Sequence, residues 1–140
     1  MAPSIFVDSD AFVAIVNASD SNHLKAKRLG EKLQGLQAQF FTSALVIEEF
    51  VSVLTIKYGL KDEAIGFARE IIKDVSFVSV DFDDLQNALT ILEKQKQTHV
   101  SLQDCLNIHL VIKHRFNAIF SFDKIYKKNN LTYASDLDLN

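Results

Sequence analysis

The sequence predicts an α/β fold, a sandwich of helices around a mostly parallel sheet. Short apolar runs alternate with longer segments in which apolar residues recur at helical spacing, and this alternation is typical of βαβ units. The chain has 140 residues, 48% of them hydrophobic, which is enough for the core of one domain. Only four glycines and one proline occur, without repeats or linkers, so we expect a single domain over residues 1–140.

The first predicted elements are a strand and two helices. Residues 4–8 are a short apolar run, which is typical of a buried strand. Residues 9–17 fit a short helix. Residues 19–33 fit a longer helix, for which Ser19 or Ser21 is a suitable N-cap.

The middle of the chain alternates in the same way. Residues 39–43 and 76–80 are short apolar runs that we expect to be strands. Residues 44–59 form a strongly apolar helical segment that ends at a glycine suited to the C′ position. Residues 61–74 fit a further helix.

Two helices and two strands complete the prediction. Residues 81–95 carry acids in the first turn, where they complement the helix dipole. Residues 101–115 begin with Ser101 as the expected N-cap. Residues 118–122 and 131–135 are the last predicted strands.

The composition narrows the functional classes. The net charge is −3, so the chain lacks overall basic character, although a local patch or a bound metal can supply positive charge to a nucleic-acid site. The single cysteine, Cys105, excludes an intrachain disulfide and suits a reducing compartment. No apolar run approaches the roughly 18 residues that a membrane span needs, and no signal-type segment is present at the start. We therefore expect a cytoplasmic protein that is not a membrane protein.

Two predicted strands end in a carboxylate. Asp8 ends the stretch IFVD, and Asp123 ends the stretch IFSFD. Ligands of open parallel sheets bind at the carboxyl ends of the strands, so we expect these two side chains to meet at one edge of the sheet. The alternative for each residue is an N-cap of the helix that follows.

A third acid lies on a helix face that is expected to be buried. Asp104 falls within the apolar stripe formed by Ile108, Val111 and Ile112, with Asn107 one turn further on. A buried carboxylate is costly unless it is paired, hydrogen-bonded or bound to a metal.

Another predicted helix contains two adjacent acids. Glu49 lies between Val53 and Ile56 and is expected to point inward, whereas Glu48 shares a polar face with Ser52. For each inward acid taken alone, the alternative is a carboxylate at the edge of the core that reaches water.

Four acids that converge would repel one another, and a divalent cation would remove that repulsion. Mg²⁺ binds carboxylate oxygens and water, and metals of this kind activate water for attack on phosphodiesters. The four acids therefore indicate phosphoryl-transfer or nuclease chemistry.

The order of these acids resembles the PIN domain family, and within it the VapC-type toxins of toxin–antitoxin pairs. The resemblance extends over nearly the whole chain and is carried by IFVD, TSALVIEEFVSVL, VSLQDCLNIHLV and IFSFDKIY. It implies a three-layer α/β/α sandwich with a mostly parallel central sheet. The function that it implies is an endoribonuclease that depends on Mg²⁺ or Mn²⁺ and serves as the toxin of a VapBC-type pair.

The resemblance also implies which residues form the site. The catalytic quartet would consist of Asp8, Glu49, Asp104 and Asp123. The metal ligands among them would be Asp8, Asp104 and Asp123. Three neighbours would orient these carboxylates: Ser9, Ser121 and Asn107.

One position departs from the family pattern. Asp10 stands where the family usually has Ser, Thr or Asn, and this extra acid would either join the metal or add repulsion. Asp8 and Asp10 also fit the DxD start of haloacid-dehalogenase-type phosphatases. That class needs a second paired-acid loop, and the segment SFDKIYKKNN offers one Asp and no Gly.

Positive charge follows the last acid directly. Lys124, Lys127 and Lys128 are candidates for contact with an RNA backbone, with a solvated loop as the alternative. The partners that the resemblance implies are an RNA substrate, an antitoxin protein and a second copy of the chain. Two other functions stay open: an RNA-processing nuclease outside toxin–antitoxin pairs, and an inactive module that binds RNA or protein.

Overall fold

The computed structural model describes residues 2–137 and has a four-stranded sheet in that part of the chain. The strands lie in the order β3-β2-β1-β4, and all three pairings are parallel. The predicted α/β fold with a parallel central sheet is therefore confirmed. The strands are β1 (Ser4–Val7), β2 (Gln39–Ser43), β3 (Ser76–Val78) and β4 (Ala118–Phe120).

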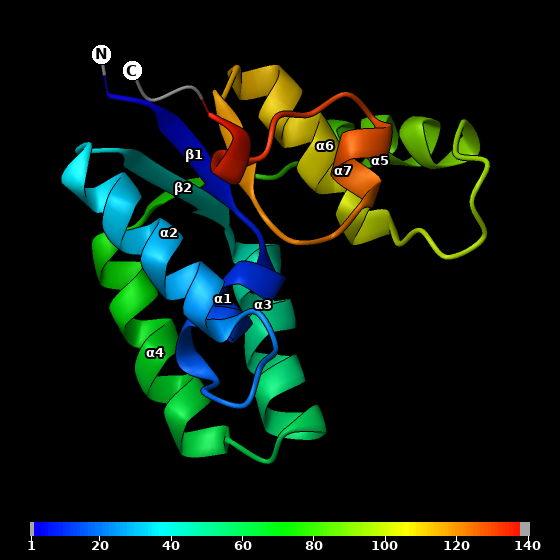
Figure 1. Ribbon diagram of the computed structural model, residues 1–140. Helices are drawn as coiled ribbons and strands as arrows, with labels where there is room; N and C mark the ends of the chain where they lie inside the picture. Colours follow the sequence, from blue (N-terminus) through cyan, green and yellow to red (C-terminus); the bar gives the residue numbers. More distant parts are fainter. Residues whose placement is uncertain (1, 138–140) are drawn as a thin grey trace.

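Helices fill the connections between the strands and form the two outer layers. Figure 1 shows α1 to α4 gathered on one side of the strands and α5 to α7 on the other. The helices are α1 (Ser9–Val16), α2 (His23–Gly35), α3 (Ala44–Ser52), α4 (Lys61–Asp74), α5 (Phe82–Glu93), α6 (Leu102–His114) and α7 (Ile125–Lys128). A π-helical turn, η1 (Val53–Lys57), extends α3, and a 3₁₀ turn, η2 (Ala134–Asp136), follows α7.

The strand order explains this division into layers. The chain moves from β1 to β2 to β3 in one direction and then returns across the sheet to place β4 on the other side of β1. Parallel crossovers are almost always right-handed, so reversing the direction moves the connecting helices to the opposite face. The reversal makes the carboxyl ends of β1 and β4 a switch point, where such sheets bind ligands.

Helix α2 starts later than the sequence predicts. Its N-cap is Asn22, not Ser19 or Ser21. The carboxylate of Asp20 accepts a hydrogen bond from the Asn22 N–H at 2.8 Å, and the Asn17 side chain accepts one from the Ser19 N–H at 3.1 Å. These side-chain bonds hold residues 17–22 in turns, which compete with the first helical turn.

The helix predicted over residues 44–59 changes its winding after Ser52. The π-helical turn η1 places Ile56 on the surface, where the residue is 83% exposed. A π turn holds more residues than an α turn, so the helix face that periodicity assigns to Ile56 is wrong. The predicted glycine stop is confirmed, since Gly59 has a φ of +68°, a conformation that glycine adopts more easily than other residues because it has no Cβ.

The predicted strand over residues 131–135 is wrong. Tyr133 makes a single parallel bridge with Ile119, and the chain then enters η2. The short helix α7 precedes this segment and was not predicted. Four helical residues are too few to establish an apolar period in the sequence.

Among the helices described for residues 2–137, none has the length and apolar character that crossing a membrane requires.

Candidate active site

Asp8 lies at the carboxyl end of β1 and is also the N-cap of α1. Its backbone N–H donates to the Phe120 carbonyl at 3.1 Å, which fixes it against the end of β4. Its Oδ1 accepts from the Ser9 N–H at 2.7 Å, and only 5% of the residue is exposed. Asp8 is thus both a helix cap and a carboxylate at the switch point.

Two buried side chains hold the Asp8 carboxylate from the opposite layer. The Tyr126 hydroxyl donates to Oδ2 at 2.6 Å, and the Asn107 side-chain NH₂ donates to Oδ1 at 3.0 Å. The same NH₂ group also donates to the Tyr126 hydroxyl at 3.0 Å. Asn107 and Tyr126 are both 0% exposed, so neither bond competes with bulk water.

Tyr126 was not among the residues that the sequence pointed to. It lies in the unpredicted helix α7, and its ring alone would suit a core position. The available signal was general: a buried tyrosine hydroxyl usually finds a hydrogen-bond partner. The sequence does not indicate that Asp8, far away in the chain, is that partner.

Asp10 lies in the first turn of α1, at the same edge of the sheet. Its Oδ2 accepts from the Phe122 N–H at 2.7 Å and from the Ser121 hydroxyl at 3.0 Å. Its Oδ1 is buried and has no hydrogen-bond partner among the described residues. Ser121 is also 3.4 Å from Asp8 Oδ2 and accepts from the Asp123 N–H at 3.1 Å, so it links three of the acids.

Asp104 and Asp123 approach the same edge from α6 and from the segment after β4. Asp104 forms a capping box with Ser101, with bonds of 3.0 and 3.2 Å, so the predicted N-cap is confirmed. Asp123 is exposed, and its Oδ1 accepts from the Ile125 N–H at 3.0 Å. Within the predicted apolar stripe beside Asp104, Ile108 and Val111 are buried.

The last member of that stripe is an exception, because Ile112 is 60% exposed. It lies near the end of α6, two residues before the last residue of that helix.

Glu49 reaches the site through a hydrogen bond from the Ser9 hydroxyl to its Oε1. Glu48 is exposed and accepts a bond from the Ser52 hydroxyl at 3.0 Å. The two adjacent glutamates therefore face different surroundings, as the helix periodicity predicts, and Glu49 is the one that lies near Asp8.

Burial and mutual repulsion shape the electrostatics of this cluster. Burial raises the pKa of Asp8 well above its ordinary value, and the charges of Asp10 and Glu49 raise it further. The pKa values of Asp10 and Asp104 are also raised, first by burial and then by the charge of Asp123. These effects join all five acids in one interacting group, which is the arrangement that a cation stabilises.

The donor set suits a hard divalent cation, because every candidate ligand is a carboxylate oxygen. The buried Asp10 Oδ1 has no partner among residues 2–137, and a cation is one group that would satisfy it. No group of three or more His, Cys, Asp or Glu side chains in that range is arranged to hold an ion as it stands. Both oxygens of Asp8 already accept hydrogen bonds, and a carboxylate oxygen that has two lone pairs can accept one hydrogen bond and still bind a cation.

The predicted lysines divide into two groups. Lys124 and Lys128 line a pocket that Asp123 also lines, whereas Lys127 is not among the residues of that pocket. The backbone N–H of Lys127 donates to the Tyr133 hydroxyl at 3.1 Å.

Comparison with known proteins gives matches of two kinds. The family model of the PIN domain matches residues 5–130. Among solved structures, VapC20 of Mycobacterium tuberculosis, described as a sarcin-ricin loop cleaving toxin, matches with a TM-score of 0.82 and 22% sequence identity. The match covers 91% of this chain and 96% of that one. No curated protein matches the sequence.

Proposed function

The chain belongs to the PIN domain family, whose model covers residues 5–130, and on this premise we propose that it is a metal-dependent endoribonuclease that hydrolyses RNA phosphodiester bonds. The family match favours this reaction over that of haloacid-dehalogenase-type phosphatases, which Asp8 and Asp10 alone would suit. The solved neighbour described as a sarcin-ricin loop cleaving toxin supports the toxin ribonuclease class. The proposal for this chain takes the reaction class from that neighbour but not its RNA target.

One observation supports the proposal most strongly: acids from four separate segments interact at the switch point of the parallel sheet. Burial is the largest cause of the raised pKa values of Asp8 and Asp104; the charges of Asp10 and Glu49 raise the pKa of Asp8 further, and the charge of Asp123 raises that of Asp104. A purely structural role in ion pairs does not explain this cluster, because all its members are negatively charged and repel one another. A site for a cation and a phosphodiester gives these carboxylates a common role.

In this proposal, Asp8, Asp104 and Asp123 hold Mg²⁺ or Mn²⁺. When bound, such a cation activates water and stabilises negative charge on the phosphate oxygens. Glu49, held by the Ser9 hydroxyl, and Asp123 orient the attacking water. Asn107 and Tyr126 would fix the direction of the Asp8 carboxylate through their hydrogen bonds, and Ser121 would fix that of Asp10.

The biological setting is part of the same proposal. We place the chain as one nuclease domain, in the cytoplasm, as the toxin of a VapBC-type pair with an antitoxin protein and a second copy of itself as partners. A short reading frame overlapping the start of this gene would support the toxin assignment. Its absence would favour an RNA-processing nuclease.

Metal removal is the direct test of the proposed reaction. Purified protein is expected to cleave total cellular RNA with added Mg²⁺ or Mn²⁺ and to lose that cleavage in excess chelator, because the acids alone supply no positive charge for the phosphate. Cleavage that persists in chelator would contradict the metal dependence. Absence of cleavage with either metal would favour the inactive binding module.

The buried hydroxyl of Tyr126 gives a second prediction. Tyr126→Phe removes the donor 2.6 Å from Asp8 Oδ2 and leaves the ring in place. We expect kcat for RNA cleavage to fall by about 10- to 100-fold with little change in KM, since outer hydrogen bonds to ligating carboxylates have effects of this size. Tyr58→Phe, at a partly exposed position on the surface, is the matched control, and an equal kcat in the two variants would rule out the positioning role.

A further inference from the structure

A pocket of about 470 Å³ lies beside Asp123, between helix α7 and the segment that follows α5. Lys96 and His99 line it from the segment after α5, and Lys124 and Lys128 line it from the other side. Asp123 belongs to its wall, so the pocket adjoins the candidate active site. Its volume falls within the range of pockets that bind small molecules or single nucleotides.

The charges of this pocket are unbalanced. Its lining includes three ammonium groups and an imidazole against the single carboxylate of Asp123. All ion pairs within residues 2–137 involve Asp84, so these lysines have no carboxylate partner in that range. This local excess of positive charge contrasts with the net charge of −3 for the whole chain.

A pair of amide side chains fastens the two walls of the pocket together. The Gln95 side-chain NH₂ donates to Asn129 Oδ1 at 3.0 Å, and the Asn129 NH₂ donates back to Gln95 Oε1 at 3.0 Å. The same groups donate to the carbonyls of Ile91 and Ile125 at 3.1 and 2.9 Å. The segment carrying Lys96 is therefore anchored to the end of α7.

We propose that this pocket binds a backbone phosphate of single-stranded RNA, next to the phosphate that is cut. The proposal rests on the proposed function for the identity of its ligand. Lysine ammonium groups bind phosphate as point charges without reading bases, so the pocket positions the strand and does not select a sequence. The Gln95–Asn129 pair holds the two cationic walls at a constant separation.

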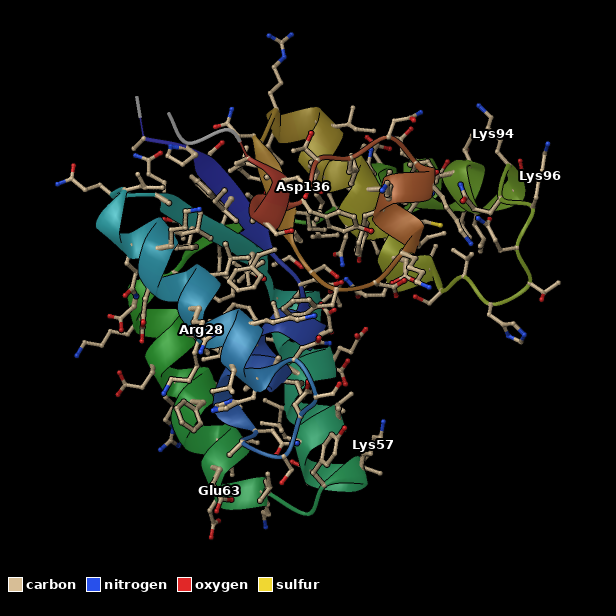
Figure 2. The ribbon with its side chains drawn as sticks, viewed as in Figure 1. Arg28, Lys57, Glu63, Lys94, Lys96 and Asp136 are labelled. Atoms are coloured by element: carbon tan, nitrogen blue, oxygen red, sulfur yellow. The ribbon has the colours of Figure 1, made fainter. Side chains whose placement is uncertain are left out.

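The experiment measures the affinity of the full chain for a fluorescently labelled single-stranded RNA, by anisotropy in chelator and over a series of salt concentrations. Chelator keeps the RNA intact, so binding is observed separately from cleavage. Lys96→Ala and Lys128→Ala are compared with Lys57→Ala. Figure 2 shows Lys96 on the segment after α5 and Lys57 at a distant part of the molecule, beyond α3.

We expect each pocket variant to bind RNA about 3- to 10-fold more weakly and to lower the slope of log affinity against log salt by about 0.7, the value for one phosphate contact to a single strand. Lys57→Ala is expected to match the wild type. Asn129→Ala removes the amide pair without removing charge, and we expect a loss of about 3-fold with the protein still folded by thermal melting. Affinities for Lys96→Ala and Lys57→Ala that agree would overturn the proposal.

Two further measurements distinguish binding of RNA from binding of free phosphate, and the pocket proposal from the nuclease proposal. Inorganic phosphate is expected to compete with RNA only weakly, and tight phosphate binding without RNA binding would overturn the assignment to RNA. RNA binding that depends on Lys96 and Lys128, without cleavage in Mg²⁺, would contradict the nuclease and support the pocket. Metal-dependent cleavage whose KM is the same in wild type, Lys96→Ala and Lys128→Ala would support the nuclease and contradict the RNA-binding role of the pocket.

Discussion

Asp8→Asn and Asp104→Asn are each expected to reduce RNA cleavage by at least about 10²-fold, which places the residual rate near the limit of most assays. Asparagine keeps the shape of each side chain and removes the negative charge that a cation would bind. The measurement is single-turnover cleavage of RNA in Mg²⁺, with wild-type protein and Glu48→Gln beside the variants. Glu48 is the matched control because it is exposed and bonded to Ser52, so its removal should leave the rate unchanged.

The same variants test whether lost cleavage reflects chemistry or unfolding. In Asp104→Asn the new side-chain oxygen would still accept the Ser101 N–H in the capping box, so thermal melting of this variant is expected to match the wild type. Burial and the charge of Asp10 disfavour ionised Asp8, so Asp8→Asn is expected to be at least as stable as wild type in chelator. A variant that stays folded and cleaves RNA at the wild-type rate would remove that residue from the site.

Asp84→Ala is expected to cause the largest loss of stability, about 2–3 kcal/mol, or roughly 10 °C in Tm. Asp84 is 2% exposed, and its Oδ1 accepts from His109 and from Lys113, each at 2.8 Å. Its Oδ2 completes a capping box at the start of α5. The substitution therefore removes the polar connection between α5 and α6, the helix that carries Asp104. Asp83→Ala, one residue away and exposed, is the control and should change Tm little.

The stability supplied by Asp84 should also depend on pH in a defined direction. Hydrogen bonds from Lys113 and the Asp81 backbone hold the pKa of Asp84 well below its ordinary value of 3.8. A depressed carboxyl pKa stabilises the fold above the unfolded-state value, and this stabilisation is lost as pH falls through the folded-state pKa. Denaturant unfolding should give a full difference between wild type and Asp84→Ala at about pH 6 and a smaller one below about pH 3.8. A constant difference over that range would contradict the ion-pair explanation.

Local signals in the sequence were sufficient for most of the fold. The strand over residues 39–43 and the helix over residues 61–74 agree with β2 and α4 at both ends. Short apolar runs and capping residues lie within a few positions of the backbone that they determine, so they can be read without tertiary information. The errors fall where a longer-range contact or an altered helix winding decided the outcome, as at the start of α2, in η1 and over residues 131–135.

The candidate site also has features that local sequence patterns predict and features that only tertiary contacts determine. The sequence by itself determined which acids end strands or face inward on helices, because alternation and helical period assign a side chain to a face. It could not determine which neighbour each acid meets. Only the tertiary structure paired Asp8 with Tyr126, 118 residues away, and left Asp10 Oδ1 without a partner among residues 2–137. The physical reason is that a hydrogen bond requires a donor at about 3 Å in a suitable direction, and such placement is set by the packing of all three layers.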